Sequence, residues 1–468
     1  MKAELFLQKF REFNRVPLNP KDRIKDNIKQ IIDNGDFVFD IHVHTFDKYC
    51  INEFYFITHF LKELIRGNNK QMILNEHFNI MDNNTNELDL ALKNFEEKYG
   101  YSDVESYYHD PNKKEISWED LDEIFSKTEL QLESERNFNK GMKHIPEALG
   151  FVFKKFFKAK SQVEIYKEYV NKYAISNINK FESSTMITGI LMMDFFNEFN
   201  GYVKRDIETQ IDEYNSIATE YNALPFLAVD PRRIDDTLEE KHQMFHLILK
   251  AFDRKESGLF VGFKFYPALG YSPSDYRLIP IYEICEEYKI PIVTHCGGET
   301  VSSFDSEIMV YENFEEKLTT VPGKNRKQKA FYLNDPKRWE VVLDRFENLK
   351  VNFAHFGDDV FRDKNEDPDL DYIARKDTIV SLMKKNNGVY ADFSYSLIRD
   401  YSYSKLIQLL TNDDVVAERM MFGSDFWVVL LHDKDRFMQI QNKFTAAFAN
   451  DEVFEKFFRR NAVDYLLK

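Results

Sequence analysis

The sequence predicts an α/β protein, a (β/α)₈ barrel of the TIM-barrel type with a large helical insertion after its first strand. Eight short apolar segments end in polar or charged residues, and most are followed by a helical pattern. Strands buried on both faces have such continuous apolar sequences, and helices between them connect a parallel sheet. The alternative, an open doubly wound sheet, usually has fewer strands and a glycine-rich phosphate loop. Neither GxGxxG nor GxxxxGK[ST] occurs in the chain.

The elements are expected in a regular order along the 468 residues. An N-terminal helical segment, residues 1–36, leads into the first strand, and the barrel occupies residues 37–468. Helical patterns precede the fifth, sixth and seventh strands, in LIPIYEICEEY, PKRWEVVLDRFEN and DTIVSLMKKNN. The expected strands are residues 37–44, 185–195, 225–232, 259–267, 290–296, 350–357, 388–395 and 419–426.

Residues 46–184 interrupt this order. The interval is far longer than a βα loop, so it must have structure of its own. It contains helical periodicity, as in FYFITHFLKELIRG, and polar breaks such as DNNTN. Because the loop after a barrel strand opens at the catalytic face, we expect a lid or pocket wall, with a structural appendage as the alternative. The absence of repeats and of a Pro/Gly/Ser-rich linker favours one elaborated barrel over two domains.

Composition limits the class of partner. Hydrophobic residues make up 43% of the chain and aromatic residues 15%, enough to build a sizeable core. The chain has 63 Lys+Arg against 79 Asp+Glu, a formal net charge of −16, which repels phosphate backbones and anionic membrane surfaces. We therefore expect a small-molecule substrate, and neither nucleic acid nor a membrane as partner. Whether the chain forms a homo-oligomer stays open.

Cysteine usage and the N-terminus indicate the compartment. Cys50, Cys285 and Cys296 are odd in number and form no CxxC pair, which suits a reducing environment. The first residues, MKAELFLQKFREFNRV, lack the uninterrupted apolar core of a signal peptide, and no later segment is long enough to span a membrane. The expected location is the cytoplasm.

The strongest local signal for chemistry is the pair His42 and His44 at the end of the first expected strand. Alternate residues of a strand point to the same side, so both imidazoles can bind one metal ion. His295, His355 and Asp425 come at the ends of the fifth, sixth and eighth strands, where this fold places its chemistry. Such a set suits zinc, iron(II) or manganese(II). The alternative is that His295 and His355 are hydrogen-bonded core residues.

The order of these residues resembles the amidohydrolase superfamily: HxH on strand one, Lys264 on strand four, histidines on strands five and six, and an aspartate on strand eight. The resemblance runs from about Phe37 to the C-terminus but skips the insertion. The closing segment FFRRNAVDYLL is similar to the last helix of the family. The chain resembles in particular the amidohydrolase-2 branch, which includes metal-dependent decarboxylases of aromatic acids.

The resemblance implies a role for each residue. His42, His44, His295 and Asp425 would bind the metal in the single-metal pattern, and Asp425 would also take a proton from the water. His355 would act as an acid/base or polarise the substrate. A metal lowers the pKa of its bound water towards neutrality, which supplies a nucleophile at physiological pH.

Lys264, in GFKFYP, bears on the number of ions. In two-metal members a strand-four lysine is carboxylated by CO₂ and bridges the ions, and KFYPALGYSPSD resembles that segment of dihydroorotases. In single-metal relatives a lysine in a similar segment stays an ordinary cation. Zinc is the expected metal, with manganese or iron as alternatives, and one ion is slightly favoured over two.

Substrate contacts are expected from residues near the strand ends. Arg232 follows AVDP and can bind a carboxylate with its planar guanidinium, and Tyr266 and Glu299 can line the pocket. A structural role is the alternative for each, as it is for Asp392.

The sequence therefore predicts an enzyme, a metal-dependent hydrolase acting on an amide, lactone or ester bond of a small molecule. The alternative is a metal-dependent, non-oxidative decarboxylase of a small carboxylic acid. A catalytically silent barrel that only binds a ligand is the third reading, and the intact set of site residues disfavours it.

Overall fold

The structure, a computed structural model, describes the residues in the ranges given at the end of this paragraph. Contacts within it define two units, each described by itself: a barrel unit of residues 1–46, 161–194 and 206–468, and a second unit of residues 47–160 and 195–205. Most of the expected insertion, residues 46–184, lies outside the described residues, so its role as a lid stays a prediction. The described residues are 1–13, 20–50, 97, 100, 161–181, 183–195, 203, 205–254, 258–298, 302–303, 305, 307–358, 360–361, 371–399, 401–426, 429 and 437–468.

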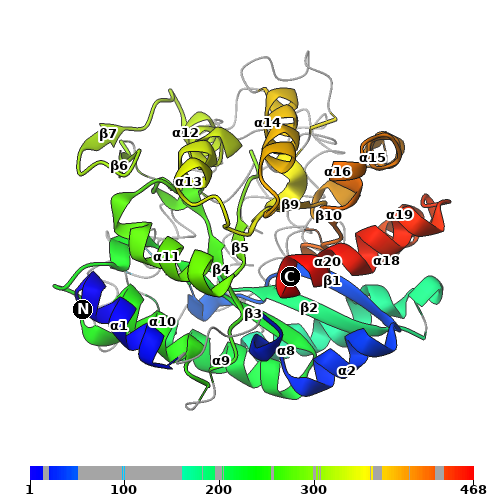
Figure 1. Ribbon diagram of the computed structural model, residues 1–468, viewed down its shortest axis with the longest axis horizontal. Helices are drawn as coiled ribbons and strands as arrows, with labels where there is room; N and C mark the ends of the chain where they lie inside the picture. Colours follow the sequence, from blue (N-terminus) through cyan, green and yellow to red (C-terminus); the bar gives the residue numbers. More distant parts are fainter. Residues whose placement is uncertain are drawn as a thin grey trace. The chain divides into compact units, whose positions relative to one another are not determined.

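The barrel unit contains a sheet of eight parallel strands in the order β1-β2-β3-β4-β5-β8-β9-β10 (Figure 1). The first and last strands of this order meet: the backbone N of Ile41 donates to the carbonyl O of Phe422 at 3.1 Å, and that of Asp425 donates to His42 at 2.9 Å. The strands thus close into a barrel, which confirms the predicted fold. The strands are β1 (Phe37–Val43), β2 (Thr185–Leu191), β3 (Ala223–Val229), β4 (Gly262–Phe265), β5 (Ile292–Thr294), β8 (Val351–Phe353), β9 (Val389–Asp392) and β10 (Met420–Met421).

Each of the eight expected apolar segments overlaps one of these strands, and β3 begins at Ala223, two residues before its segment. β1, β3, β4 and β5 are buried along their whole length, as expected for strands with the barrel interior on one side and helices on the other. The strands are shorter than the apolar segments: β10 has only two residues of the segment 419–426, and β2 ends at Leu191 although its segment runs to Phe195. The residues that follow each strand leave the sheet at its carboxyl end, where the polar side chains lie.

Helices connect the strands and pack on the outside of the sheet, α9 and α10 against β3 and α14 against β9. The three helical patterns predicted before strands five, six and seven correspond to α11, α13 and α14. None of the described helices is long and apolar enough to cross a membrane. The helices are α1 (Ala3–Phe13), α2 (Asp26–Asn34), α8 (Gln162–Glu168), α9 (Ile207–Glu220), α10 (Met244–Phe252), α11 (Ile279–Tyr288), α12 (Arg326–Leu333), α13 (Glu340–Arg345), α14 (Tyr372–Lys385), α15 (Tyr401–Asn412), α16 (Asp414–Ala417), α18 (Phe437–Ala446), α19 (Asp451–Glu455) and α20 (Asn461–Leu467).

Several helix starts follow from their first residues. Asp206 caps α9 by accepting from the backbone N of Thr209 at 2.8 Å, and Asp371 caps α14 by accepting from that of Ala374 at 2.9 Å. Such caps satisfy a backbone N–H that has no partner within the helix. They fix where each helix begins after the strand that precedes it.

A hairpin between β5 and β8 was not predicted. Its strands are β6 (Met309–Tyr311) and β7 (Leu318–Thr320), which pair in antiparallel fashion and form a separate two-stranded sheet. β7 is exposed along its length, and only Val310 of β6 is fully buried. Strands this short and this exposed carry no apolar run for a sequence pattern to reveal.

Lys350 lies at the amino-terminal end of β8. Its Nζ donates to the carbonyl O of Tyr465 at 3.1 Å, in the last turn of α20, where carbonyl groups lack helical partners. Burial, together with the nearby cations Arg23 and Lys289, lowers the pKa of Lys350 from 10.5 to about 7. The contact holds α20 to the end of the barrel opposite the polar strand ends.

Replacing Lys350 by methionine is expected to change how stability depends on pH. Because the folded pKa is lowered, the unfolded chain binds more protons between the two pKa values. The stability of the native chain therefore rises with pH across that window, by up to about 1.4 kcal/mol per pH unit. Methionine does not titrate, so the native chain should gain stability over K350M between about pH 7 and about pH 10. Chemical denaturation of both proteins measures this, and parallel pH profiles would refute it.

Candidate metal centre

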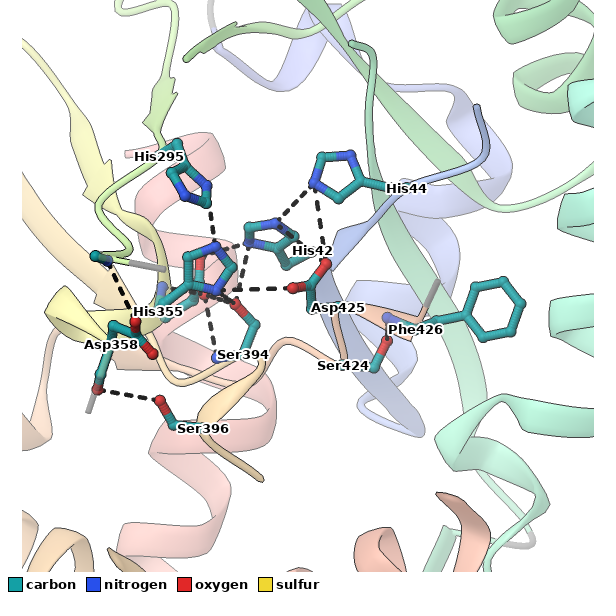
Figure 2. Close-up of polar contacts among 12 residues, drawn as sticks. His42, His44, His295, His355, Asp358, Ser394, Ser396, Ser424, Asp425 and Phe426 are labelled. Atoms are coloured by element: carbon teal, nitrogen blue, oxygen red, sulfur yellow. Dashed lines mark hydrogen bonds and ion pairs between the residues drawn. The ribbon is translucent and has the colours of Figure 1, made fainter. Parts of the chain in front are cut away.

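The predicted site residues converge at the carboxyl ends of the strands. Figure 2 shows His42, His44, His295 and His355 turned towards one another, with Asp425 beside them. All are buried, and all belong to the barrel unit. The ring centroid of His355 lies 4.8 Å from that of His42 and 4.7 Å from that of His295. The barrel therefore brings together residues that lie far apart in the sequence.

The backbone is strained where the strands end. His355 has φ = 63° and Asp425 has φ = 45°, in the left-handed region that side chains other than glycine rarely adopt. Neighbouring hydrogen bonds hold Asp425 there: its own N donates to His42, and the N of Ser424 donates to Oδ1 of Asp40 at 2.9 Å. Strain of this kind persists where the surroundings enforce it, and it clusters at functional sites.

The four imidazoles are neutral at physiological pH. Burial lowers the pKa of each below its ordinary value, well below it for His44, His295 and His355; for His42 the carboxylate of Asp392 partly opposes the effect. A neutral imidazole has one N–H donor and one bare nitrogen acceptor. The partners of each ring therefore decide which nitrogen is bare.

The bare nitrogens of His42 and His44 face each other. Nδ1 of His44 lies 2.8 Å from the carbonyl O of Leu191, and Nδ1 of His42 lies 3.2 Å from Oδ2 of Asp392. The carbonyl and the carboxylate only accept, and Oγ of Ser394, also 3.2 Å from Nδ1 of His42, gives its hydrogen to Asp392, so both Nδ1 atoms carry the hydrogen. The two Nε2 atoms are left bare only 3.1 Å apart. Two lone pairs at this distance repel each other unless a cation lies between them or beside them.

Asp425 completes this arrangement with a carboxylate. Its Oδ1 lies 3.9 Å from Nε2 of His42 and 4.0 Å from Nε2 of His44, and it accepts no hydrogen bond from the part of the chain that the structure describes. Burial raises the pKa of Asp425 to about 8, and Lys264 opposes the shift. A buried, unpartnered carboxylate oxygen is costly without a cation.

His295 and His355 differ in the use of their nitrogens. Nε2 of His295 is buried and has no hydrogen-bond partner in the described ranges. Both nitrogens of His355 have partners: Nε2 lies 3.2 Å from Nδ1 of His295, and Nδ1 lies 2.8 Å from Oγ of Ser394. His295 thus offers a bare nitrogen, whereas His355 does not.

These donors fit a divalent metal ion. By distance alone, ligand atoms of His42, His355 and Asp425 form a group in which all lie within 4.8 Å of one another. The hydrogen-bond partners favour a different group, because both nitrogens of His355 are in use. Among these imidazoles and Asp425, the buried atoms without a hydrogen-bond partner in the described residues are Nε2 of His295 and Oδ1 of Asp425. Together with the facing Nε2 atoms of His42 and His44 they would supply three nitrogens and one oxygen, a ligand set typical of zinc.

Lys264 lies on β4, inside the same site. Its Nζ is buried and makes no hydrogen bond to any described residue, and it lies 5.9 Å from the centre of the Tyr266 ring. Burial lowers the pKa of Lys264 to about 8, with Asp392 and Asp425 opposing the shift. Whether this amine is ever carboxylated stays a prediction.

The predicted substrate-binding residues lie in different settings. The guanidinium of Arg232 pairs with Asp230, with Nη2 2.6 Å from Oδ2. Tyr266 packs against the ring of His295, with the centroids 4.1 Å apart. Glu299 lies outside the described residues. A substrate contact from any of the three stays a prediction.

Asp392 has a larger role than its sequence position indicated. Its carboxylate accepts from the side chains of His42 and Asn352 and from the backbone N of His355 and of Ser394. Oγ of Ser394 also donates to it. The signal was present in ADFSY, where Asp392 and Ser394 alternate at the end of β9 and so share a face.

Comparisons with known proteins identify the family of the chain. A family model described as amidohydrolase matches residues 177–466. No curated protein matches the sequence. Solved structures that are similar include an uncharacterized TIM-barrel protein from Bordetella bronchiseptica, 15% identical over 65% of this chain and 82% of that chain, with a TM-score of 0.40. A putative 2-pyrone-4,6-dicarboxylic acid hydrolase from Pseudomonas putida is 12% identical over 64% and 86%, with a TM-score of 0.39. The 4-oxalomesaconate hydratase from Rhodopseudomonas palustris is 13% identical over 92% and 95%, with a TM-score of 0.37.

Proposed function

The chain belongs to the amidohydrolase family, and from this premise we propose that it is a metal-dependent hydrolase of an amide, lactone or ester bond in a small molecule. One observation carries the proposal. The bare nitrogens of His42 and His44 face each other at 3.1 Å, and a carboxylate oxygen of Asp425 without a hydrogen-bond partner lies beside them. A core packed only for stability would leave no such set of acceptors without donors.

We infer that one metal ion, expected to be zinc, is held by His42, His44, His295 and Asp425. When bound, the metal would polarise the substrate carbonyl and lower the pKa of the attacking water. A second ion would need His355 as a ligand, and both of its nitrogens already have hydrogen-bond partners. This supports a single ion and an uncarboxylated Lys264.

The residues of the chain supply the remaining steps. Asp425 would accept the proton of the attacking water through Oδ2, because Oδ1 is the atom that we assign to the metal. His355, which does not bind the metal in this assignment, would act as an acid/base that takes up a proton at Nε2 and returns it to the reacting group. Burial of the whole cluster excludes bulk water and strengthens each of these interactions.

Metal analysis with an activity panel tests the proposal. Elemental mass spectrometry of protein purified without chelators is expected to find about one ion per chain. Chelation should abolish hydrolysis of amide, lactone or ester substrates, and zinc should restore it. If carbon dioxide release from small aromatic acids is the only metal-dependent reaction, the chain is a decarboxylase. Failure to bind metal after reconstitution would refute both enzyme assignments.

A further inference from the structure

We propose that Ser394 is a positioning residue of the metal site, whose hydroxyl sets the tautomers of His355 and His295. It does so by connecting the two imidazoles to the carboxylate of Asp392, at the end of β9. The inference rests on the proposed function, because the atom that it affects, Nε2 of His295, is one that the proposed function assigns to the metal. In this assignment β9 contributes no metal ligand, yet through Ser394 it would affect metal binding.

The carboxylate of Asp392 fixes the direction of the hydrogen bonds. Its Oδ1 accepts from the backbone N of His355 at 3.1 Å and from that of Ser394 at 3.2 Å, and its Oδ2 accepts from Nδ2 of Asn352 at 2.8 Å. These partners are all N–H donors, so both oxygens of Asp392 act as acceptors. Oγ of Ser394, which has a single hydrogen, therefore donates it to Oδ1 of Asp392.

This hydrogen bond from Ser394 to Asp392 determines the tautomer of His355. Since the hydrogen of Ser394 is used, its Oγ can only accept from Nδ1 of His355, 2.8 Å away. Nδ1 of His355 thus carries the hydrogen, and its Nε2 is the acceptor. The chain of hydrogen bonds then runs in one direction, away from the imidazole and towards Asp392.

The tautomer of His355 in turn determines that of His295. Its Nδ1 lies 3.2 Å from Nε2 of His355 and must donate to it. The single hydrogen of His295 is therefore on Nδ1, and its Nε2 is bare, as its lack of a partner in the described residues indicates. With His42 and His44, all four imidazoles carry hydrogen on Nδ1, the less populated tautomer of free neutral histidine.

Loss of the hydroxyl would release this arrangement. Without an acceptor at Oγ, His355 can move its hydrogen to Nε2 and donate to Nδ1 of His295. His295 would then carry hydrogen on Nε2, the atom that we assign to the metal. Ser394 thus affects metal binding through two imidazoles without contacting the ion.

Tautomers and metal affinity test the proposal in separate measurements. Nitrogen-15 NMR of histidine-labelled, metal-free protein is expected to show hydrogen on Nδ1 of His295 and His355, with signals assigned by single substitutions. In Ser394→Ala both residues should shift towards the Nε2–H form. Zinc affinity, measured by competition titration, should fall roughly 10- to 100-fold, as is typical when a residue that supports a metal ligand through hydrogen bonds is lost.

Ser396→Ala is the matched control. Ser396 is also buried in the loop after β9, and its hydroxyl donates to the carbonyl O of Asp358 at 3.2 Å, not to a histidine. The histidine tautomers and the zinc affinity of S396A should equal those of the native chain. The proposal is overturned if the native chain shows Nε2–H at His295, if S394A changes neither readout, or if S396A changes both equally. The tautomer readout needs no metal or substrate, so failure of the proposed function would be seen separately.

Discussion

Replacing His295 by alanine is expected to abolish stoichiometric metal binding, whereas replacing His355 by alanine should leave the metal bound. The two imidazoles lie in contact and are equally buried, so distance and burial do not distinguish them. Their hydrogen bonds do, because Nε2 of His295 is bare and both nitrogens of His355 have partners. The pair of variants therefore tests the ligand assignment directly.

The expected magnitudes differ accordingly. H355A should weaken zinc binding by no more than roughly 10- to 100-fold, as is typical when a residue that hydrogen-bonds a metal ligand is lost. H295A should weaken zinc binding by far more. Turnover should fall in both, in H355A with the metal still bound. Competition titration and elemental analysis of the purified variants provide the measurement, with circular dichroism as the check on folding. The reverse order of affinities would assign the metal to His42, His355 and Asp425, whose ligand atoms lie within 4.8 Å of one another.

The barrel and the histidine positions could be predicted because both depend on local sequence. A strand buried on both faces is an apolar run, and a polar residue that ends such a run lies at the carboxyl edge of the barrel. His42, His44 and Asp425 were found in this way, and the structure places them within 4.0 Å of one another.

The role of Asp392 and Ser394 could not be predicted in the same way. Asp392 and His42 are 350 positions apart, and only closure of the barrel brings the carboxylate to Nδ1 of the imidazole. Alternation in ADFSY showed that the two side chains share a face, yet gave no partner for either. Arg232 pairs with Asp230, only two positions away, and its residue type alone gave no indication of this partner.

Asp425→Asn is expected to lower the turnover number by about 10²- to 10⁴-fold, the usual contribution of a general base. The amide has nearly the same shape as the carboxylate but cannot accept a proton from water. KM should change little, because Asp425 acts on the water and not on the bound substrate in this assignment. Metal content must be measured in the same samples, so that loss of the ion is separated from loss of the base.

The stability of this variant gives an independent readout. Burial raises the pKa of Asp425 to about 8, which means that its charged form is disfavoured in the folded chain. A neutral isostere removes this cost, so the metal-free D425N protein should unfold at a temperature no lower than that of the native chain. Glu312→Gln is the matched control: Glu312 is a buried carboxylate outside the site, 3.0 Å from Nη1 of Arg338. That variant should lose stability through its broken ion pair and keep full activity. If D425N retained native turnover with metal bound, Asp425 would not be the base, and the proton would have to pass to another group of the cluster.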